Sequence, residues 1–349
     1  FNTYQNSISF SKKINKINFF LNLDKIKSDG YRDNNTYDNN RIFGSINYEI
    51  NKNYTIDLIH FNNSANALIP SSLSLENFVN DPSSAAFSWR NVKGGEDYNR
   101  SVTGLTFNSK KSKYTSSSTI FFKTFNNNEN RPFNYLIEDS DSYGLRHIGK
   151  LQLSPFNVSY GLEYSYENYS FNTWDEYGTE DESIITQQTQ KRKNYNFFFQ
   201  LDRSFENSFL TFGIGSNKIN YNWVEEINST SYSYKTKTIL SPRISYNHNL
   251  NSSSIFANIS HGFSSPNIDE TLDENGLVNS EIKPETGWNY ELGLIGTAKN
   301  NILSYVISLY FMDIKNLLVA QRTNFDTYTG VNAGRTSHPG LETTINFPL

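Results

Sequence analysis

Apolar and polar residues alternate over several stretches of the chain. In the clearest stretch, 156–167, every even-numbered position from Phe156 to Tyr166 is apolar or aromatic, and every odd-numbered position is small or polar. Successive side chains of a strand point to opposite faces, whereas a helical period of about 3.6 residues would mix the two sets. The stretch therefore predicts a strand with one apolar and one wet face. Similar runs lie at 17–23, 42–50, 195–201 and 303–311, and no long stretch has helical spacing.

The connections between these runs alternate between short and long. Short polar turns fall near 12–16, 51–53, 109–113, 154–155, 205–208, 249–253 and 298–301. Long polar loops are predicted near 28–40, 63–97, 126–142, 170–193, 221–236 and 261–287. Between them lie about fifteen predicted strands, many near the ~9–11 residues that a tilted strand needs to cross a bilayer. Long loops on every second connection are typical of a membrane barrel, whose two rims face different compartments.

The composition supports strands with one wet face. The chain of 349 residues is 36% hydrophobic and 19% charged, yet it contains 26 Phe and 23 Tyr. A disordered chain carries few aromatics, so disorder is a poor explanation. The net charge of −4 argues against a nucleic-acid partner. No apolar run approaches the ~18 residues of a membrane helix.

Short motifs gather in the last third of the chain. In order they are Ser241-Pro242-Arg243, Ser260-His261-Gly262-Phe263, Ser265-Pro266, Glu270, Lys283-Pro284-Glu285-Thr286, Trp288, Glu291-Leu292-Gly293, Phe311-Met312-Asp313-Ile314, Asn332-Ala333-Gly334 and Gly340-Leu341-Glu342. From about residue 240 onward, their order and spacing resemble the barrel of TonB-dependent outer-membrane receptors of the ferric-chelate or siderophore type. The segment 28–32 also fits this family, whereas 60–230 shares only its rhythm of strands and loops.

This resemblance implies an all-β fold, a transmembrane antiparallel β-barrel of about 22 strands plugged by an N-terminal domain. Fifteen strands are fewer and odd in number, and the chain stops at 346–349 within a predicted strand. We therefore expect residues 1–349 to be an incomplete barrel, with the plug domain and the last strands absent from this chain. The resemblance also implies residence in the outer membrane of a Gram-negative bacterium, with outer-membrane lipid around the barrel.

Most of the motifs have a structural explanation. Trp288 falls where an aromatic girdle would meet the membrane edge. Pro242 cannot donate a ladder hydrogen bond, so we place it at a strand end or a bulge. Gly334 and Gly340 fit a bend in a strand or a close approach of two backbones.

Enzyme chemistry has no candidate in the sequence. No metalloprotease, nucleophile-elbow, P-loop or dinucleotide-binding motif is present, and the chain has no Cys. The five His residues are scattered without ligand spacing. We therefore expect no catalytic residues, no metal site and no cofactor.

Ligand capture by the long loops is the remaining chemistry. The predicted 63–97 loop offers Trp89, Arg90 and Lys93. The predicted 126–142 loop offers Arg131 and Tyr135, and the predicted 170–193 loop offers Trp174. Arg forms forked hydrogen bonds to carboxylates, and aromatic rings add flat, stiff contact area. Our hypothesis is that Arg90 and Arg131 help to hold an anionic ferric chelate; the alternative is that all six are ordinary loop or girdle residues.

The resemblance implies uptake of a scarce ligand, with a ferric siderophore or ferric dicitrate as the expected cargo. The family also imports cobalamin, other metal complexes and glycans. Its motor partner, the TonB complex, would act through the missing plug, so this chain alone should not transport. Two alternatives stay open at this point, namely a passive outer-membrane porin and a secreted, soluble β-rich binding protein.

Overall fold

The computed structural model describes residues 2–175, 178–179, 182–266, 269–271, 279, 281–298, 302–322 and 328–347. Its strands are β1 (Tyr4–Ile14), β2 (Ile17–Ser28), β3 (Tyr37–Asn51), β4 (Tyr54–Leu68), β5 (Gly95–Lys110), β6 (Tyr114–Arg131), β7 (Asn134–Leu153), β8 (Phe156–Asp175), β9 (Ser183–Ser204), β10 (Ser208–Glu225), β11 (Thr230–Lys235), β12 (Ile239–Leu250), β13 (Ser253–Ser264), β14 (Glu285–Ala298), β15 (Leu303–Lys315), β16 (Leu318–Arg322), β17 (Tyr328–Asn332) and β18 (Arg335–Asn346). Two short helices, α1 (Leu75–Asn80) and α2 (Phe87–Asn91), and a 3-10 turn at Asp269–Thr271 complete the described elements.

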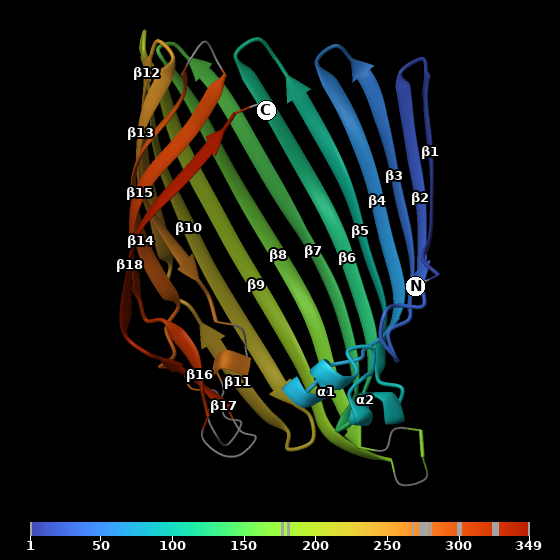
Figure 1. The fold of residues 1–349 in the computed structure, drawn as a ribbon. Helices are drawn as coiled ribbons and strands as arrows, with labels where there is room; N and C mark the ends of the chain where they lie inside the picture. The colour runs from blue at the N-terminus through green and yellow to red at the C-terminus, as the bar shows by residue number, and fades with distance from the viewer. Residues whose placement is uncertain are drawn as a thin grey trace.

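Fifteen strands follow one another through a single antiparallel sheet, in the order β1 to β10, β12 to β15, then β18. This confirms the predicted count of about fifteen. Strand β11 pairs with one end of β10, and β16 and β17 form a separate hairpin. Among the described residues no pairing joins β1 to β18, and Figure 1 shows an open, curved wall in which β14, β15 and β18 stand in front of β10.

The two ends of the strands differ. Turns of a few residues join the strands at the top of Figure 1, and this is called the turn end. The longer connections, both short helices and the β16–β17 hairpin lie at the bottom, which is called the loop end. No helix in the described part of the chain is long and apolar enough to cross a membrane, a criterion that does not apply to strands.

Several of the predicted long loops are wrong in extent. Strand β6 continues to Arg131 and β7 starts at Asn134, so only a two-residue turn remains of the predicted 126–142 loop. Likewise β8 and β9 fill most of 170–193, and β10 and β11 fill most of 221–236. Where a strand continues beyond the bilayer, both of its faces meet water. The alternation of apolar and polar residues therefore ends there, although the backbone hydrogen bonds between the strands continue.

The sheet has two distinct faces. The register places Leu145, Tyr164 and Tyr195 in one row across β7, β8 and β9, and most large apolar side chains that are exposed share this apolar face. Leu162, for example, is 43% exposed. Glu163 and Ser165 alternate with these residues and lie on the opposite face, called the polar face.

Among the described residues, buried hydrophobic side chains form one small cluster on the polar face and not a continuous core. The cluster is Tyr221, Trp223 and Tyr234, near the loop end of β10 and β11. A soluble sandwich would instead bury the apolar faces of two sheets against each other. The arrangement is that of a membrane-barrel wall, with an apolar surface turned outward.

The structural predictions for single residues agree with this wall for Pro242 and Trp288 but not for the two glycines. Pro242 lies near the start of β12, opposite Ile214 of β10, and pairing with β13 starts only at the following residue. Trp288 belongs to a row of aromatic rings on the apolar face, 6.3 Å from the ring of Tyr290. Gly340 lies so close to Tyr310 that a Cβ there would be 2.2 Å from the ring, so a side chain, and not a second backbone, approaches it. Gly334 lies between β17 and β18 with a positive φ of 98° and open space around it, so neither a strand bend nor a close approach explains it.

Candidate functional site

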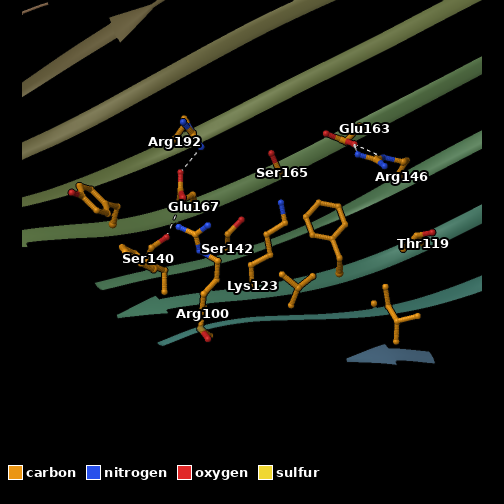
Figure 2. A pocket seen from close by; sticks show the side chains of 17 residues that line it. Arg100, Thr119, Lys123, Ser140, Ser142, Arg146, Glu163, Ser165, Glu167 and Arg192 are labelled. Carbon is orange, nitrogen blue, oxygen red and sulfur yellow. Dashed lines mark hydrogen bonds and ion pairs between the residues drawn. The ribbon is translucent and has the colours of Figure 1, made fainter. Parts of the chain in front are cut away.

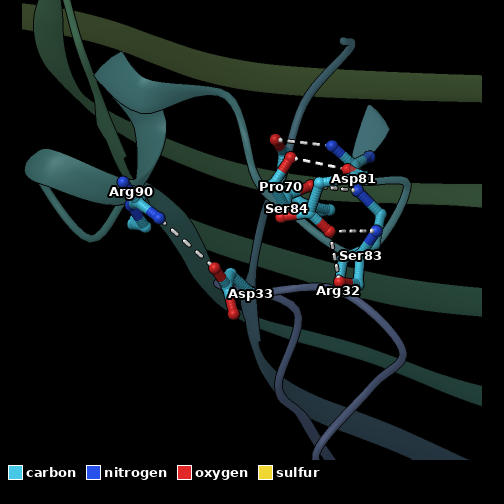
Figure 3. A network of polar contacts seen from close by, with 7 residues as sticks. All are labelled: Arg32, Asp33, Pro70, Asp81, Ser83, Ser84 and Arg90. Carbon is cyan, nitrogen blue, oxygen red and sulfur yellow. Dashed lines mark hydrogen bonds and ion pairs between the residues drawn. The ribbon is translucent and has the colours of Figure 1, made fainter. Parts of the chain in front are cut away.

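Arg32 organises the loop end of the wall. Its guanidinium donates hydrogen bonds to the carbonyl oxygens of Ser84 at 2.9 Å and Pro70 at 3.3 Å (Figure 3). It also donates to the carbonyl oxygen of Ser71 at 2.6 Å. All three acceptors belong to the 69–94 loop, which joins β4 to β5. The side-chain amide of Asn34 adds bonds to the carbonyls at the two ends of that loop. The 29–36 loop therefore fixes the shape of the 69–94 loop.

Trp89, Arg90 and Lys93 lie at the end of this anchored loop. Trp89 and Arg90 are part of α2, and Lys93 follows it with a positive φ of 52°. The Arg90 guanidinium lies 3.3 Å from the carboxylate of Asp33, and both side chains are exposed. An exposed ion pair of this kind is worth little, so Arg90 can exchange Asp33 for another anion.

Arg131, Tyr135 and Trp174 lie at the loop ends of β6, β7 and β8. Tyr135 and Trp174 are directly opposite each other in the ladder, and their register places them on the side of the sheet that continues the apolar face. Arg131 continues the polar face, where its guanidinium lies 5.1 Å from the ring centre of Phe133 and 4.0 Å from the carboxylate of Glu129.

The structure thus separates the six residues into two groups. Arg131 and the 89–93 segment are linked through Asn130, whose amide donates to the carbonyl of Val92 at 2.7 Å. Within the described residues, no hydrogen bond or ion pair joins Arg90 to Arg131. Tyr135 and Trp174 form the second group, on the side of the sheet that continues the apolar face.

Burial also shapes the electrostatics of the loop end. Burial raises the pKa of the Glu129 carboxyl, with Arg131 opposing the shift and Glu96 and Glu138 adding to it. Near the loop end of β10 and β11, burial raises the pKa of the Tyr234 hydroxyl to about 12.

The described residues contain no group of His, Cys, Asp and Glu that could hold a metal ion.

A second group of charged residues lies on the polar face, within the wall. It is the lumen cluster, made of Arg100, Lys123, Arg146, Arg192, Glu163 and Glu167, and it lines a hollow of about 660 Å³ across β5 to β9 (Figure 2). Ser140, Ser142, Ser165 and Thr119 contribute hydroxyl groups to the same hollow.

Two of the four cations in the lumen cluster are paired. Arg146 forms an ion pair with Glu163, and Arg192 lies 2.7 Å from the carboxylate of Glu167, which also accepts a hydrogen bond from Ser140 at 3.0 Å. These pairs hold both arginines in place along the strands.

The other two cations lie over aromatic rings. The Arg100 guanidinium is 5.0 Å from the centre of the Phe125 ring, and the Lys123 ammonium is 5.0 Å from that of Phe121. No carboxylate in the described part of the chain lies within ion-pair distance of either. The hollow therefore holds two more cations than carboxylates, and it suits an anion.

Sequence reasoning missed the lumen cluster because its members come from five strands and form no local motif. One signal could have found them. Outward residues such as Leu105, Ile120 and Leu145 show which alternate positions of each strand face away from the interior. Charged residues at the positions between them must then face inward. The register that brings these positions side by side is a property of the assembled sheet.

The family of the chain follows from comparison with known proteins. The family model described as "TonB dependent receptor-like, beta-barrel" matches residues 2–348. The chain belongs to this family. Barrels of the family lie in the outer membrane of Gram-negative bacteria, which is the location of this chain, and they are receptors and transporters. No curated protein sequence matches the chain.

Solved structures share the fold at low sequence identity. The ferric citrate transporter FecA in the unliganded form is 15% identical with a TM-score of 0.79, and the match covers 99% of this chain and 53% of FecA. The copper transporter OprC is 14% identical with a TM-score of 0.81, covering 99% and 56%. The siderophore receptor PirA from Pseudomonas aeruginosa is 15% identical with a TM-score of 0.71, covering 99% and 60%. The chain thus spans little more than half the length of these proteins.

Proposed function

We propose that this chain is the partial barrel of an outer-membrane receptor that takes up an anionic metal chelate, a ferric siderophore or ferric dicitrate, by TonB-coupled transport. The observation that carries the proposal is the excess of cations in the hollow of the lumen cluster. The family and the fold support a receptor barrel. Similar structures include a ferric citrate transporter and a siderophore receptor.

The chemistry of the lumen cluster suits carboxylate-bearing chelates. Arg100 presents a planar fork that matches a carboxylate, and Lys123 adds a compact positive charge. The rings of Phe125 and Phe121 beneath them reduce the freedom of both side chains. Because Arg146 and Arg192 are held by carboxylates, Arg100 and Lys123 are the cations that a chelate meets without breaking an ion pair.

The residues of the loop end have an earlier role in this proposal. Trp89, Arg90 and Lys93 contact the ligand as it arrives, and Arg131 passes it toward the lumen cluster on the same face. Tyr135 and Trp174 face the opposite side of the sheet, so any contact with the ligand requires a different approach.

Coupling to TonB requires a plug domain. The chain matches little more than half of each similar structure. We therefore propose that residues 1–349 are joined, in the whole receptor, to a plug and to the strands that close the barrel. The alternative is a passive porin, in which the cationic wall selects anions that diffuse through.

The test measures uptake of radioactive ferric dicitrate by cells that carry the whole receptor and lack their own ferric citrate receptor. We expect uptake to require TonB, and we expect the double variant Arg100→Gln/Lys123→Gln to reduce it about tenfold, which corresponds to about 1.4 kcal/mol. The matched control is Lys12→Gln/Lys27→Gln, which removes two charges on the apolar face.

Two results would contradict the proposal in different ways. Uptake that continues without TonB would show a porin. TonB-dependent uptake that the double variant leaves unchanged would show that the lumen cluster does not meet the chelate.

A further inference from the structure

Four lysines lie together on the apolar side of β9, β10 and β11, just beyond the apolar belt. They are Lys191 and Lys193 on β9, Lys218 on β10 and Lys235 on β11, and this group is called the lysine patch. Lys193 and Lys235 are both directly opposite Asn220, one from each side. Adjacent strands are about 4.8 Å apart, so the two Cα atoms are separated by about 10 Å.

The register fixes the direction of these side chains. Lys218 is opposite Tyr195, and Lys193 is opposite Tyr166, and both tyrosines belong to the apolar face. Arg192, between the two lysines of β9, points to the polar face and pairs with Glu167. The lysine patch is therefore outside the barrel wall, on the side opposite the lumen cluster.

The lysine patch adjoins exposed aromatic rings. The rings of Tyr164 and Tyr195 are 5.2 Å apart, and Tyr195 shares a row of the ladder with Lys218, as Tyr166 does with Lys193. Tyrosine is enriched where the hydrocarbon of a bilayer meets the headgroups. The lysines beside these rings are thus at the depth of the headgroups of the outer leaflet.

These lysines lack acidic partners. Within the described residues no carboxylate is in ion-pair distance of any of the four, and the neighbouring outward positions on β10 and β11 are Asn220, Asn222 and Ser233. Two other outward cations near the loop end do have carboxylate partners, since Lys25 lies 3.5 Å from Asp38 and Arg335 lies 2.5 Å from Asp313.

Like charges on adjacent strands repel one another, so an unbalanced group of four costs free energy unless an anion lies over it. We propose that the lysine patch binds the phosphate groups of a phosphorylated lipid of the outer leaflet, with the acyl chains lying along the exposed side chains of Tyr195 and Phe197. Continuity with the apolar belt favours a lipid over a soluble acidic protein, because one molecule can then cover both the charged and the apolar surface.

The test compares binding of two lipids to the whole receptor in detergent micelles by native mass spectrometry. The probes are lipid A with both phosphates and lipid A from which the phosphates have been removed. The test variant is Lys191→Gln/Lys193→Gln/Lys218→Gln/Lys235→Gln. The matched control, Lys12→Gln/Lys25→Gln/Lys27→Gln/Lys315→Gln, removes four charges from other parts of the same face.

We expect the test variant to bind phosphorylated lipid A at least about tenfold more weakly than the unmodified receptor, since it loses the attraction of four positive charges for the phosphates. The control variant should change by less than about twofold. Replacing the same four lysines by Arg should preserve binding, which would show that binding depends on the positive charges and that the barrel is folded.

Equal binding of the two lipids, or an equal loss in the test and control variants, would overturn the proposal. Retention of an acidic protein that phosphorylated lipid A fails to displace would also overturn it.

Discussion

Replacement of Arg32 by Ala tests how the loop end is built. The substitution removes the bonds to the carbonyls of Ser71, Ser84 and Pro70, at 2.6, 2.9 and 3.3 Å. A hydrogen bond to a charged group is worth about 1.5–3 kcal/mol when shielded. Arg32 is only half-buried, so we count about 1–1.5 kcal/mol for each of the two short bonds and nothing for the long one. The closed form of the 69–94 loop should lose about 2–3 kcal/mol.

Hydrogen exchange of the whole receptor, followed by mass spectrometry, measures this loss. A change of 2–3 kcal/mol corresponds to an acceleration of roughly 30- to 150-fold in the interior of the loop. The effect should be smaller at Ile69 and Gly94, because the amide of Asn34 still bonds to both carbonyls.

Replacement of Arg90 by Ala is the matched control. It removes the same charge from the same region but breaks only an exposed ion pair with Asp33. Such pairs contribute at most about 1 kcal/mol, so exchange should rise less than about fivefold. Equal acceleration in the two variants, or none with Arg32→Ala, would refute the assignment of Arg32 as the anchor.

Three further predictions concern the wall and its loop end. Leu162→Arg places a charge on the apolar face and should cost about 2–4 kcal/mol in refolding into lipid vesicles, whereas Ser159→Arg on the polar face of the same strand should cost little. Because its native-state pKa is raised, Glu129 destabilises the native state increasingly as pH rises through that pKa. Glu129→Gln should therefore raise the unfolding temperature more at pH 8 than at pH 4, and an equal effect at both would contradict this. Tyr234→Phe leaves the buried carbonyl of Ile282 without its 2.8 Å hydrogen bond, which should cost about 1–2 kcal/mol. Unchanged hydrogen exchange in the peptide that carries Ile282 would argue against that role.

The sequence predicts the wall well where lipid imposes a pattern. The alternation of 156–167 identifies β8 and both of its faces, because a strand between hydrocarbon and water must separate apolar from polar side chains. Beyond the bilayer that requirement ends. Residues 126–131 and 134–142 therefore look like loop in the sequence, although they continue β6 and β7.

The site could be predicted only in part, because its contacts join residues distant in the chain. Arg90 meets Asp33, 57 positions earlier, and this pairing depends on how two loops fold over each other. Arg100 and Arg192 come to one hollow only through the registers of five strands. The two-residue period of a strand predicts the face on which a residue lies. Its neighbours on the other strands depend on the registers of the assembled sheet.

The central claim is that the apolar face meets lipid and the polar face meets water. The chain has no cysteine, so single cysteines can be introduced along β8 from Val158 to Ser165 and spin-labelled in the whole receptor in a bilayer. Accessibility to oxygen should peak at positions such as Leu162 and Tyr164, and accessibility to a water-soluble nickel chelate should peak at Ser159 and Ser165. A reversed alternation, or profiles without a two-residue period, would contradict the account.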